Sequence, residues 1–394
     1  MLGAFELDPD LVHLNHGSYG AVPSEVRREQ DRWRTAIERN PTGFFQDQLP
    51  DALRGMAAHA ARRFGGCSDD WVFCENVTAA VNGVLQSLAL GPNDEILTTS
   101  HAYGAVLKAM TLVSARRGAT LKVADLPAML EHDEQVIAAV GSALGPRTRL
   151  LVIDHITSAT ATILPVRRIA SLARAAGVPI LIDGAHVPGQ LALDVSALGA
   201  DWYTGNAHKW LFAPRGCGLL WTAPARQEIT RPAVLSHGTD QGYAAAFDWI
   251  GTRDPSPWLC FETAALAHDA FGGKELMSRN RELAATAAGD LASELAAPVA
   301  GPPAMRASMA ALLLDRRTGA AEQAAAIRHA FASERHIMVP VYGFSDALWL
   351  RISAQVYNTA DDYRVLADAC RTLLPRFGVG SCGIPGTIGT NRHR

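Results

Sequence analysis

The sequence lacks the features that mark several classes of protein. No apolar run approaches the roughly 20 residues of a membrane-spanning helix, and the first residues, MLGAFELDPD, lack the basic and apolar blocks of a secretory signal. The formal net charge is -3, with no basic stripe for nucleic acid and no acidic tail for a basic partner. We therefore expect a cytoplasmic protein with a small-molecule substrate, and neither nucleic acid nor a membrane as its partner.

The chain also lacks the patterns of a metal site or a disulfide framework. Its six cysteines, at positions 67, 74, 217, 260, 370 and 382, include no C-x-x-C pair. Its histidines never form H-E-x-x-H or a similar cluster of ligands. We therefore expect no metal, and thiols that are buried or idle.

A dinucleotide-binding fold is not indicated either. The last residues contain G-x-G-x-x-G at Gly378, Gly380 and Gly383, but this motif needs a preceding strand and a following helix. Here the chain ends about a dozen residues later, so we interpret the match as chance and expect residues 381–394 to form a flexible tail.

What is present is enough apolar sequence for a large core. The chain has 394 residues, of which 48% are hydrophobic, and this predicts a large domain with a second, smaller one. From about residue 70 to 222, short apolar runs alternate with helical stretches, as in WVFCEN, EILTTS, TLKVADL, RLLVIDH, PILIDGA, DWYTGNA and GCGLLWT. Such alternation is typical of a mostly parallel sheet buried on both faces, so we expect an α/β fold.

The remainder of the chain has a different pattern. From about residue 260 onward, Ala-rich helical segments surround two candidate strands, SMAALLLD and ALWLRISA, which suits a smaller α+β domain. We expect a large domain over residues 46–255 and a small domain over 256–380. Residues 1–45 are expected to contribute to the small domain and to the active site.

Three segments place chemically useful groups where strands end, which is where open α/β sheets bind ligands. The first, ILIDGAH, is an apolar strand that ends at Asp183 and is followed by His186. A buried carboxylate needs a cation or a donor, and a protonated pyridine nitrogen would satisfy it. Capping of the next helix explains Asp183 equally well when it is viewed alone.

The second segment, WYTGNAHKWL, places Lys209 after a short strand and among aromatic residues. Removal of the amine from water lowers its pKa and supplies the neutral form that condenses with an aldehyde. A lysine beside aromatic residues is, by itself, more often a surface residue with a buried stem.

The third segment, ENVTAAVNGVL, starts a helix directly after a strand. Its free backbone N–H groups and positive end form an anion site, and we expect Thr78 to cap this helix and its amide to hold a phosphate. A plain helix cap is the alternative. Together, an imine-forming lysine, a carboxylate and a phosphate site are what pyridoxal 5'-phosphate (PLP) requires.

At these residues the sequence resembles class V aminotransferases, which are PLP-dependent enzymes of fold type I with an aspartate-aminotransferase-like architecture. The similarity is greatest to the branch of isopenicillin N epimerases and cysteine C–S lyases. It covers nearly the whole chain, through LNHGSYGAVP, ERNPTGFF, ENVTAAVN, DHITSATATILPV, DGAHVPGQ, YTGNAHKWL, GTRDPSPWL and LRISAQVYNTADD.

The resemblance implies roles for residues around the cofactor ring. Lys209 corresponds to the Schiff-base lysine, and Asp183 to the partner of the pyridine nitrogen. His186 and Ser158 correspond to residues near the phenolic oxygen. Tyr103 takes the place of the ring that stacks on the pyridine, with proton relay as a second catalytic role, although an ordinary core aromatic is the alternative.

The resemblance also implies contacts to the phosphate. Asn206 and His208 correspond to side chains that bind it, alongside the backbone at Val77 and Thr78. Thr252 corresponds to a contact donated by the neighbouring subunit. The resemblance therefore implies a homodimer with active sites at the subunit interface.

Four residues correspond to substrate-binding positions. Arg351 resembles the clamp for the substrate carboxylate, for which a guanidinium is well shaped, and a surface ion pair is the alternative. His16, Tyr19 and Arg253 resemble residues of the substrate pocket, although a capped turn explains the segment of His16 and Tyr19 nearly as well. His155 is explained equally by a structural role.

Two departures from the family pattern affect the substrate. Relatives carry acidic residues beside the stacking tyrosine, where this chain has Ser100, Ala102 and Tyr103, and this leaves room for a different or larger substrate. Between Cys260 and Arg351 there is no cysteine, which argues against persulfide chemistry of the desulfurase type.

We therefore expect β-elimination at a C–S bond of a cysteine conjugate or a related small molecule such as a natural-product intermediate. Epimerisation is the main alternative, with Tyr103 as a second acid/base, followed by decarboxylation-dependent deamination and transamination. A non-catalytic binding module with the same fold is a different hypothesis, and the joint presence of Lys209, Asp183 and His208 argues against it.

Overall fold

The computed structural model describes residues 2–379. The predicted flexible tail, 381–394, and two glycines of the G-x-G-x-x-G match, Gly380 and Gly383, lie outside these residues.

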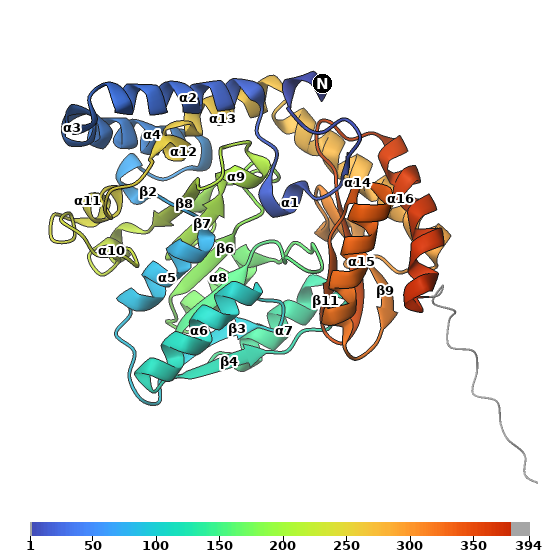
Figure 1. The fold of residues 1–394 in the computed structure, drawn as a ribbon. Helices are drawn as coiled ribbons and strands as arrows, with labels where there is room; N and C mark the ends of the chain where they lie inside the picture. The colour runs from blue at the N-terminus through green and yellow to red at the C-terminus, as the bar shows by residue number, and fades with distance from the viewer. Residues whose placement is uncertain (1, 380–394) are drawn as a thin grey trace, which may run out of the picture.

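A central sheet of seven strands dominates the structure (Figure 1). Its order is β2-β8-β7-β6-β5-β3-β4, and β8 runs antiparallel to both of its neighbours, whereas β3 to β7 are mutually parallel. The strands are β2 (Trp71–Cys74), β3 (Glu95–Thr99), β4 (Thr120–Ala124), β5 (Thr148–Asp154), β6 (Ile180–Gly184), β7 (Trp202–Asn206) and β8 (Gly218–Thr222). The expected α/β fold with a mostly parallel sheet is confirmed.

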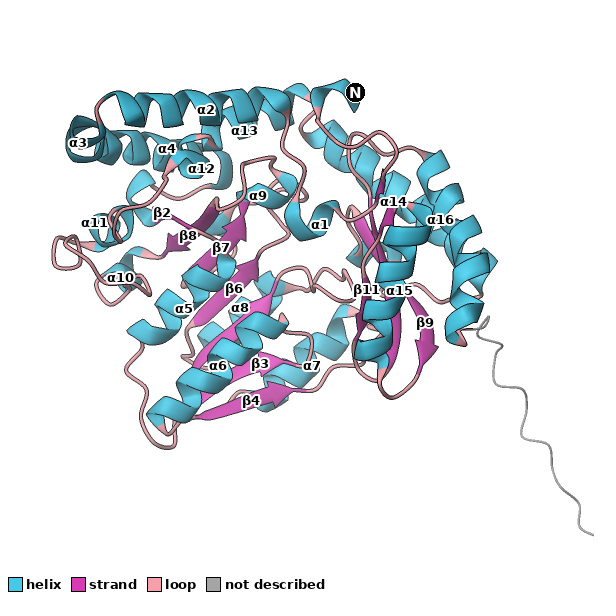
Figure 2. Cartoon of the chain, viewed as in Figure 1, coloured by secondary structure: helices cyan, strands magenta, loops and turns pink. Residues whose placement is uncertain are grey.

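Both faces of this sheet are buried, because successive side chains of a strand point to opposite faces. In β5, Leu151 and Ile153 join one apolar cluster, whereas Leu150 and Val152 join another. Helices lie on both sides of the magenta strands in Figure 2. They are α5 (Val77–Ser87), α6 (Gly104–Arg117), α7 (Asp133–Ala143), α8 (Val166–Ala175), α9 (Ala207–Trp210), α10 (Pro224–Gln227) and α11 (Tyr243–Asp248), with a 3-10 turn, η4 (Val195–Ala197).

The N-terminal segment contacts elements that lie far along the chain. Helix α2 packs against α12 and α13, and the short strand β1 pairs in parallel with β10 (Ile337–Met338) far along the chain. The elements are η1 (Leu2–Ala4), β1 (Val12–His13), α1 (His16–Tyr19), α2 (Ser24–Arg39), α3 (Pro41–Gly43), η2 (Phe44–Gln48), α4 (Leu49–Phe64), η3 (Ser68–Asp70), α12 (Ser256–Leu259) and α13 (Phe261–Ala270).

A second core surrounds a three-stranded antiparallel sheet of order β11-β12-β9. Its strands β9 and β12 occupy the two segments predicted as strands. The elements are α14 (Lys274–Leu295), η5 (Pro303–Met305), β9 (Met309–Arg316), α15 (Ala320–Arg335), β11 (Val341–Gly343), β12 (Ala347–Ser353), α16 (Ala360–Leu373) and η6 (Leu374–Phe377). Helices α12 and α13 share the core of the central sheet, and the expected domain limits stay predictions.

No helix within residues 2–379 has both the length and the apolar character needed to cross a membrane.

Candidate active site

Polar residues gather at the carboxyl ends of the parallel strands. Asp154 ends β5, Asp183 lies near the end of β6, and Asn206 ends β7. Asp154 is the register partner of Asp183, which is in turn the partner of Thr204. The two aspartates are 5% and 3% exposed. The strands therefore bring carboxylates together at the edge where such sheets bind ligands.

Lys209 lies beside these carboxylates, on the short helix α9 that follows β7. Burial and repulsion from Arg351 lower the pKa of its amine to about 8, against the opposing attraction of Asp183 and Asp154. An amine with this pKa is neutral in roughly a tenth of molecules at pH 7, far more often than an ordinary lysine. The site thus supplies the nucleophilic form of the side chain.

His186 faces the Lys209 amine. Its Nε2 lies 3.3 Å from Lys209 Nζ, and Trp210 Nε1 donates a long hydrogen bond of 3.4 Å to its Nδ1. Burial, together with the charges of Lys209 and Arg351, holds the pKa of His186 well below its usual value, so the ring is neutral. Because Nδ1 accepts from Trp210, the neutral ring carries its proton on Nε2, where it can donate to the neutral form of the Lys209 amine.

The first turn of α5 is the predicted site for the phosphate. Its cap is Asn76, whose side chain accepts from the Ala79 amide at 2.9 Å, so the prediction that Thr78 caps this helix is wrong. Both residue types cap helices well, and the cap lies two residues earlier than expected. Asn206 Oδ1 accepts from the Val77 amide at 3.0 Å and fixes this turn to β7.

His208 lies on α9, two residues after Asn206. Its Nδ1 lies 3.1 Å from the Cys217 carbonyl, to which it donates, so Nε2 carries the lone pair of a neutral ring. Burial, with the neighbouring Lys209 charge as a smaller cause, lowers the pKa of His208 to about 4. A bound phosphate would attract a proton to this ring.

Arg351 is a buried cation, 1% exposed, on strand β12. Its Nη1 donates to the Ser158 carbonyl at 2.6 Å, and its Nη2 donates to Ser18 Oγ at 3.3 Å. The Tyr342 ring lies 5.0 Å from the guanidinium carbon. Within residues 2–379 the guanidinium has no carboxylate as an ion-pair partner. Since an uncompensated buried charge is costly, this site is built to receive an anion.

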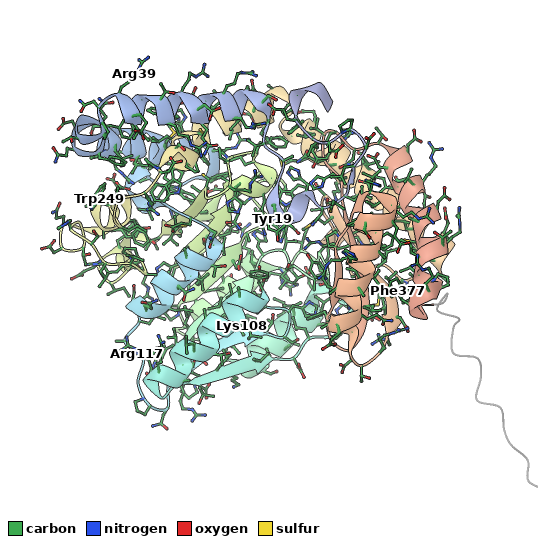
Figure 3. The ribbon with its side chains drawn as sticks, viewed as in Figure 1. Tyr19, Arg39, Lys108, Arg117, Trp249 and Phe377 are labelled. Carbon is green, nitrogen blue, oxygen red and sulfur yellow. The ribbon has the colours of Figure 1, made fainter. Side chains whose placement is uncertain are left out.

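Two tyrosines are accessible near these charges. Tyr103, the residue before α6, is 46% exposed, and Tyr19, at the end of α1, is 70% exposed. Burial, then Tyr342, Asp183 and Tyr19, raises the pKa of Tyr103, so its hydroxyl stays protonated. Figure 3 labels Tyr19 near the middle of the view, between the central sheet and the elements of the second core.

His16 is wholly buried and supports Lys209. Its Nε2 lies 2.8 Å from the Lys209 carbonyl, and its Nδ1 lies 2.8 Å from the Tyr357 hydroxyl. Both ring nitrogens therefore hydrogen bond within the protein, and the role of His16 in substrate binding stays a prediction. Burial lowers the pKa of His16 to about 3, which keeps the ring neutral.

Arg253 and Thr252 lie in the segment between α11 and α12. The Arg253 guanidinium forms an ion pair with Glu75 and stacks 3.7 Å from the centre of the Trp258 ring. Glu75 directly precedes the cap of α5, so Arg253 lies beside the start of this helix, and its role in substrate binding stays a prediction. Thr252 is exposed, and its contact across a subunit interface stays a prediction.

Three residues of this region were not predicted: Asp154, Ser18 and Tyr342. Asp154 ends the strand segment LLVID as Asp183 ends ILID, so the same signal was present. Ser18 and Tyr342 carry no such pattern, because only the fold brings them to Arg351.

The donor groups fit PLP. A partly buried lysine of lowered pKa, a buried aspartate and a helix N-terminus stand where they would hold its aldehyde, ring nitrogen and phosphate. The fold and site thus define a PLP-dependent enzyme. Residues 28–364 match the family model described as aminotransferase class-V, and the chain belongs to this family.

Its curated relatives include an isopenicillin N epimerase from Streptomyces clavuligerus, 34% identical over 94% of this chain and 97% of the epimerase. A putative L-cysteine desulfhydrase 1 from Oryza sativa subsp. japonica is 33% identical over 92% of this chain and 83% of its own. Among solved structures, a complex of the cystine C–S lyase C-DES with its product cysteine persulfide has a TM-score of 0.79 at 21% identity, covering 93% of this chain and 98% of that one. The last comparison shows the fold.

Proposed function

We propose that this enzyme is a lyase that eliminates a thiol from the β carbon of a cysteine S-conjugate or a related small molecule. The observation that carries the proposal is the buried guanidinium of Arg351, which has no carboxylate partner among the described residues and lies close enough to the Lys209 amine to lower its pKa. An amino acid with a free carboxylate supplies the missing anion. Its α carbon would then lie toward Lys209, and relatives named L-cysteine desulfhydrase support cleavage at the β carbon.

PLP, when bound, withdraws electrons from the α carbon of an amino acid and makes its proton acidic. Arg351 binds the substrate carboxylate through two parallel N–H donors and so fixes the direction of the α C–H bond. The neutral Lys209 amine removes the α proton. His186, held neutral, donates from Nε2 and keeps the lone pair of the amine oriented.

The elimination step forms a Cα–Cβ double bond and breaks the Cβ–S bond. The pair of electrons left by the α proton forms a double bond to the β carbon, and the β C–S bond breaks with its electrons on sulfur. The protonated Tyr103 hydroxyl, at the accessible side of the pocket, gives a proton to the leaving thiolate. Hydrolysis of the released enamine consumes one water and gives pyruvate and ammonia beside the thiol.

A second candidate is epimerisation at the α carbon. It is favoured by the relative named isopenicillin N epimerase and by Tyr103, whose protonated hydroxyl offers an acid apart from Lys209. In that reaction Lys209 removes the proton from one face and Tyr103 returns one to the other.

We also propose a cytoplasmic homodimer in which Thr252 of one subunit contacts the phosphate in the other. The exposed position of Thr252 near the start of α5 supports this arrangement.

The test is incubation of the purified enzyme with a series of S-substituted cysteines in deuterated water. The lyase predicts pyruvate and free thiol in equal amounts, and none with Lys209→Ala. Deuterium at the α carbon of recovered substrate, with no pyruvate for any conjugate, would reject the lyase and favour the epimerase.

A further inference from the structure

The site contains a second buried carboxyl that the chemistry above does not use. Asp154 is directly paired with Asp183 in the parallel ladder of β5 and β6. Directly paired residues of neighbouring strands point to the same face, and such strands lie about 4.8 Å apart. Both side chains are almost completely buried, at 5% and 3% exposure. Two carboxyls therefore share one small, dry space.

Few groups are available to neutralise two negative charges there. Lys209 attracts both carboxylates, and the Ala185 amide donates to Asp183 Oδ1 at 2.9 Å. The other titratable neighbours are neutral: His155 and Tyr203 hydrogen bond to each other at 3.1 Å, and Tyr103 is protonated. Arg351 is engaged by Ser158 and Ser18. Adjacent buried carboxyls with too little compensating charge retain one proton between them.

The surroundings of the two carboxyls decide which one keeps the proton. Burial, and then the charge of Asp183, raises the pKa of Asp154 well above its usual value. Burial also raises the pKa of Asp183, against the Ala185 amide and the Lys209 charge. Backbone N–H groups and the Lys209 charge act against the rise at Asp154 as well, but there the charge of Asp183 adds to burial and the rise is the larger one. The proton therefore rests mainly on Asp154. The Tyr103 backbone also hydrogen bonds to Asp154, which acts against the rise in pKa but places this carboxyl against the segment that carries the exposed tyrosine.

We propose that Asp154 is a positioning residue that carries the one proton shared by this pair. It thereby keeps Asp183 as the single negative charge available to the ring nitrogen of PLP. Its carboxyl also joins the end of β5 to the backbone at Tyr103. One side chain therefore positions both Asp183, the predicted partner of the PLP ring nitrogen, and the segment of Tyr103, which is predicted to stack on the PLP ring.

The direct test is infrared spectroscopy of the holoenzyme with isotope-labelled aspartate carboxyls at neutral pH. We expect the C=O stretch of a protonated carboxylic acid in the wild type and its loss in Asp154→Asn. Asp248→Asn is the matched control, because Asp248 is also shielded but has Arg54 as an ion-pair partner at 2.6 Å, so this variant should keep the band. A wild type without the band, or a band that survives in Asp154→Asn, overturns the proposal.

PLP affinity of the apoenzyme gives a second readout. Asn imitates a neutral carboxyl, so Asp154→Asn should bind PLP within about threefold of wild type, whereas Asp183→Asn should bind at least about tenfold more weakly. Equal weakening in both variants would mean that Asp154 acts as an anion, which contradicts the proposal. Circular dichroism confirms that each variant is folded. Neither readout needs turnover, so a failure of the proposed lyase reaction is distinguishable from a failure here.

Discussion

Arg351 and Lys209 illustrate how single residues acquire chemistry from their surroundings. Each is a cation, yet neither has a carboxylate within ion-pair distance among the described residues. Arg351 repels the ammonium form of Lys209 and is the second cause of the lowered pKa of Lys209, after burial. A substrate carboxylate on Arg351 would relieve this repulsion and raise the pKa of Lys209, which makes the amine a stronger base at the moment of use.

Arg351→Lys tests the carboxylate clamp. A lysine keeps the charge but loses the two parallel donors, so we expect KM to rise by about tenfold or more while kcat changes less. Steady-state kinetics with the best substrate measures both values. Arg316→Lys, at the exposed end of β9, is the control and should match wild type. An unchanged KM in Arg351→Lys would remove this residue from substrate binding.

His155 provides a test of pH dependence. Burial lowers the pKa of its ring to about 4, whereas the unfolded chain titrates near 6.5. The unfolded state therefore binds more protons between these values, and stability falls as the pH drops from 6.5 toward 4. At about pH 5 the protonation of this one residue in the unfolded chain lowers the free energy of unfolding by roughly 2 kcal/mol.

His155→Gln should reduce the loss of unfolding free energy between pH 7 and pH 5 by that amount, as measured by urea denaturation at both values. His329→Gln, at an exposed position of α15, should leave the loss unchanged. If His155→Gln retains the full loss, the histidine is not the group that titrates.

At the residue level, sequence patterns located the chemistry only where a side chain ends a buried strand. Asp183 and Lys209 follow apolar runs, and the fold does bring them together. The three residues Asp154, Ser18 and Tyr342 were missed for different reasons. Ser18 and Tyr342 act through Arg351, which is more than 300 residues from Ser18. Asp154 becomes significant only through its ladder partner, and strand pairing is a long-range property that one strand does not reveal.

Among the elements, the ends of β6 and β7 are held at a close approach that a larger residue would break. A Cβ atom at Gly184 would lie 2.1 Å from the Tyr203 hydroxyl, so β6 passes Tyr203 only because this position has no side chain. The same strand end carries Asp183. Its packing therefore sets the position of the carboxylate.

Gly184→Ala should destabilise the protein by about 1–3 kcal/mol and weaken PLP binding, because the strand or Tyr203 must move. Thermal unfolding and PLP titration measure the two effects. Gly55→Ala is the matched control: Gly55 is exposed in α4 with nothing within 4 Å of its Cβ position, so we expect a gain of about 0.5–1 kcal/mol from helix propensity. Unchanged stability and PLP binding in Gly184→Ala would show that the strand end has room to relax.

The sequence predicted long elements well and short ones poorly. All seven strands of the central sheet coincide with predicted strand runs. The interior strands are buried on both faces and must be apolar throughout, whereas the edge strand β4 is largely exposed. Strands β1 and β10 have two residues each and β11 has three, which is too short for any periodicity. The α5 cap was misplaced because Asn76 and Thr78 are both good caps, and only the backbone geometry separates them.

At the scale of the whole molecule, the pocket draws on parts of the chain that are distant in sequence. Asp183 comes from the central sheet, Lys209 from the helix α9 that follows β7, and Arg351 from the second sheet. His16 joins Lys209 to Tyr357. A shift between the two sheets would therefore alter the distance between the carboxylate clamp and the base. Sequence patterns indicated two cores, but nothing in them fixed how the second sheet lies against the first.

The proposed homodimer makes a prediction about an exposed apolar segment. Val234 and Leu235 are 55% and 65% exposed in the segment between α10 and α11. We expect wild type to sediment as a dimer, and Leu235→Glu to dissociate measurably at the same concentration, because a buried unpaired charge opposes association. Val365→Glu, on α16 with Val365 45% exposed, is the control and should remain dimeric. A wild-type monomer that retains full activity would contradict the arrangement.

The most direct test of the whole account concerns the bond between one lysine and the cofactor. The chain contains four lysines, Lys108, Lys122, Lys209 and Lys274. Borohydride reduction of the PLP-bound enzyme, followed by peptide mass spectrometry, identifies the lysine that holds the cofactor. The account predicts phosphopyridoxyl on Lys209 and on no other lysine. An unmodified Lys209, or label on Lys108, Lys122 or Lys274 instead, would contradict it.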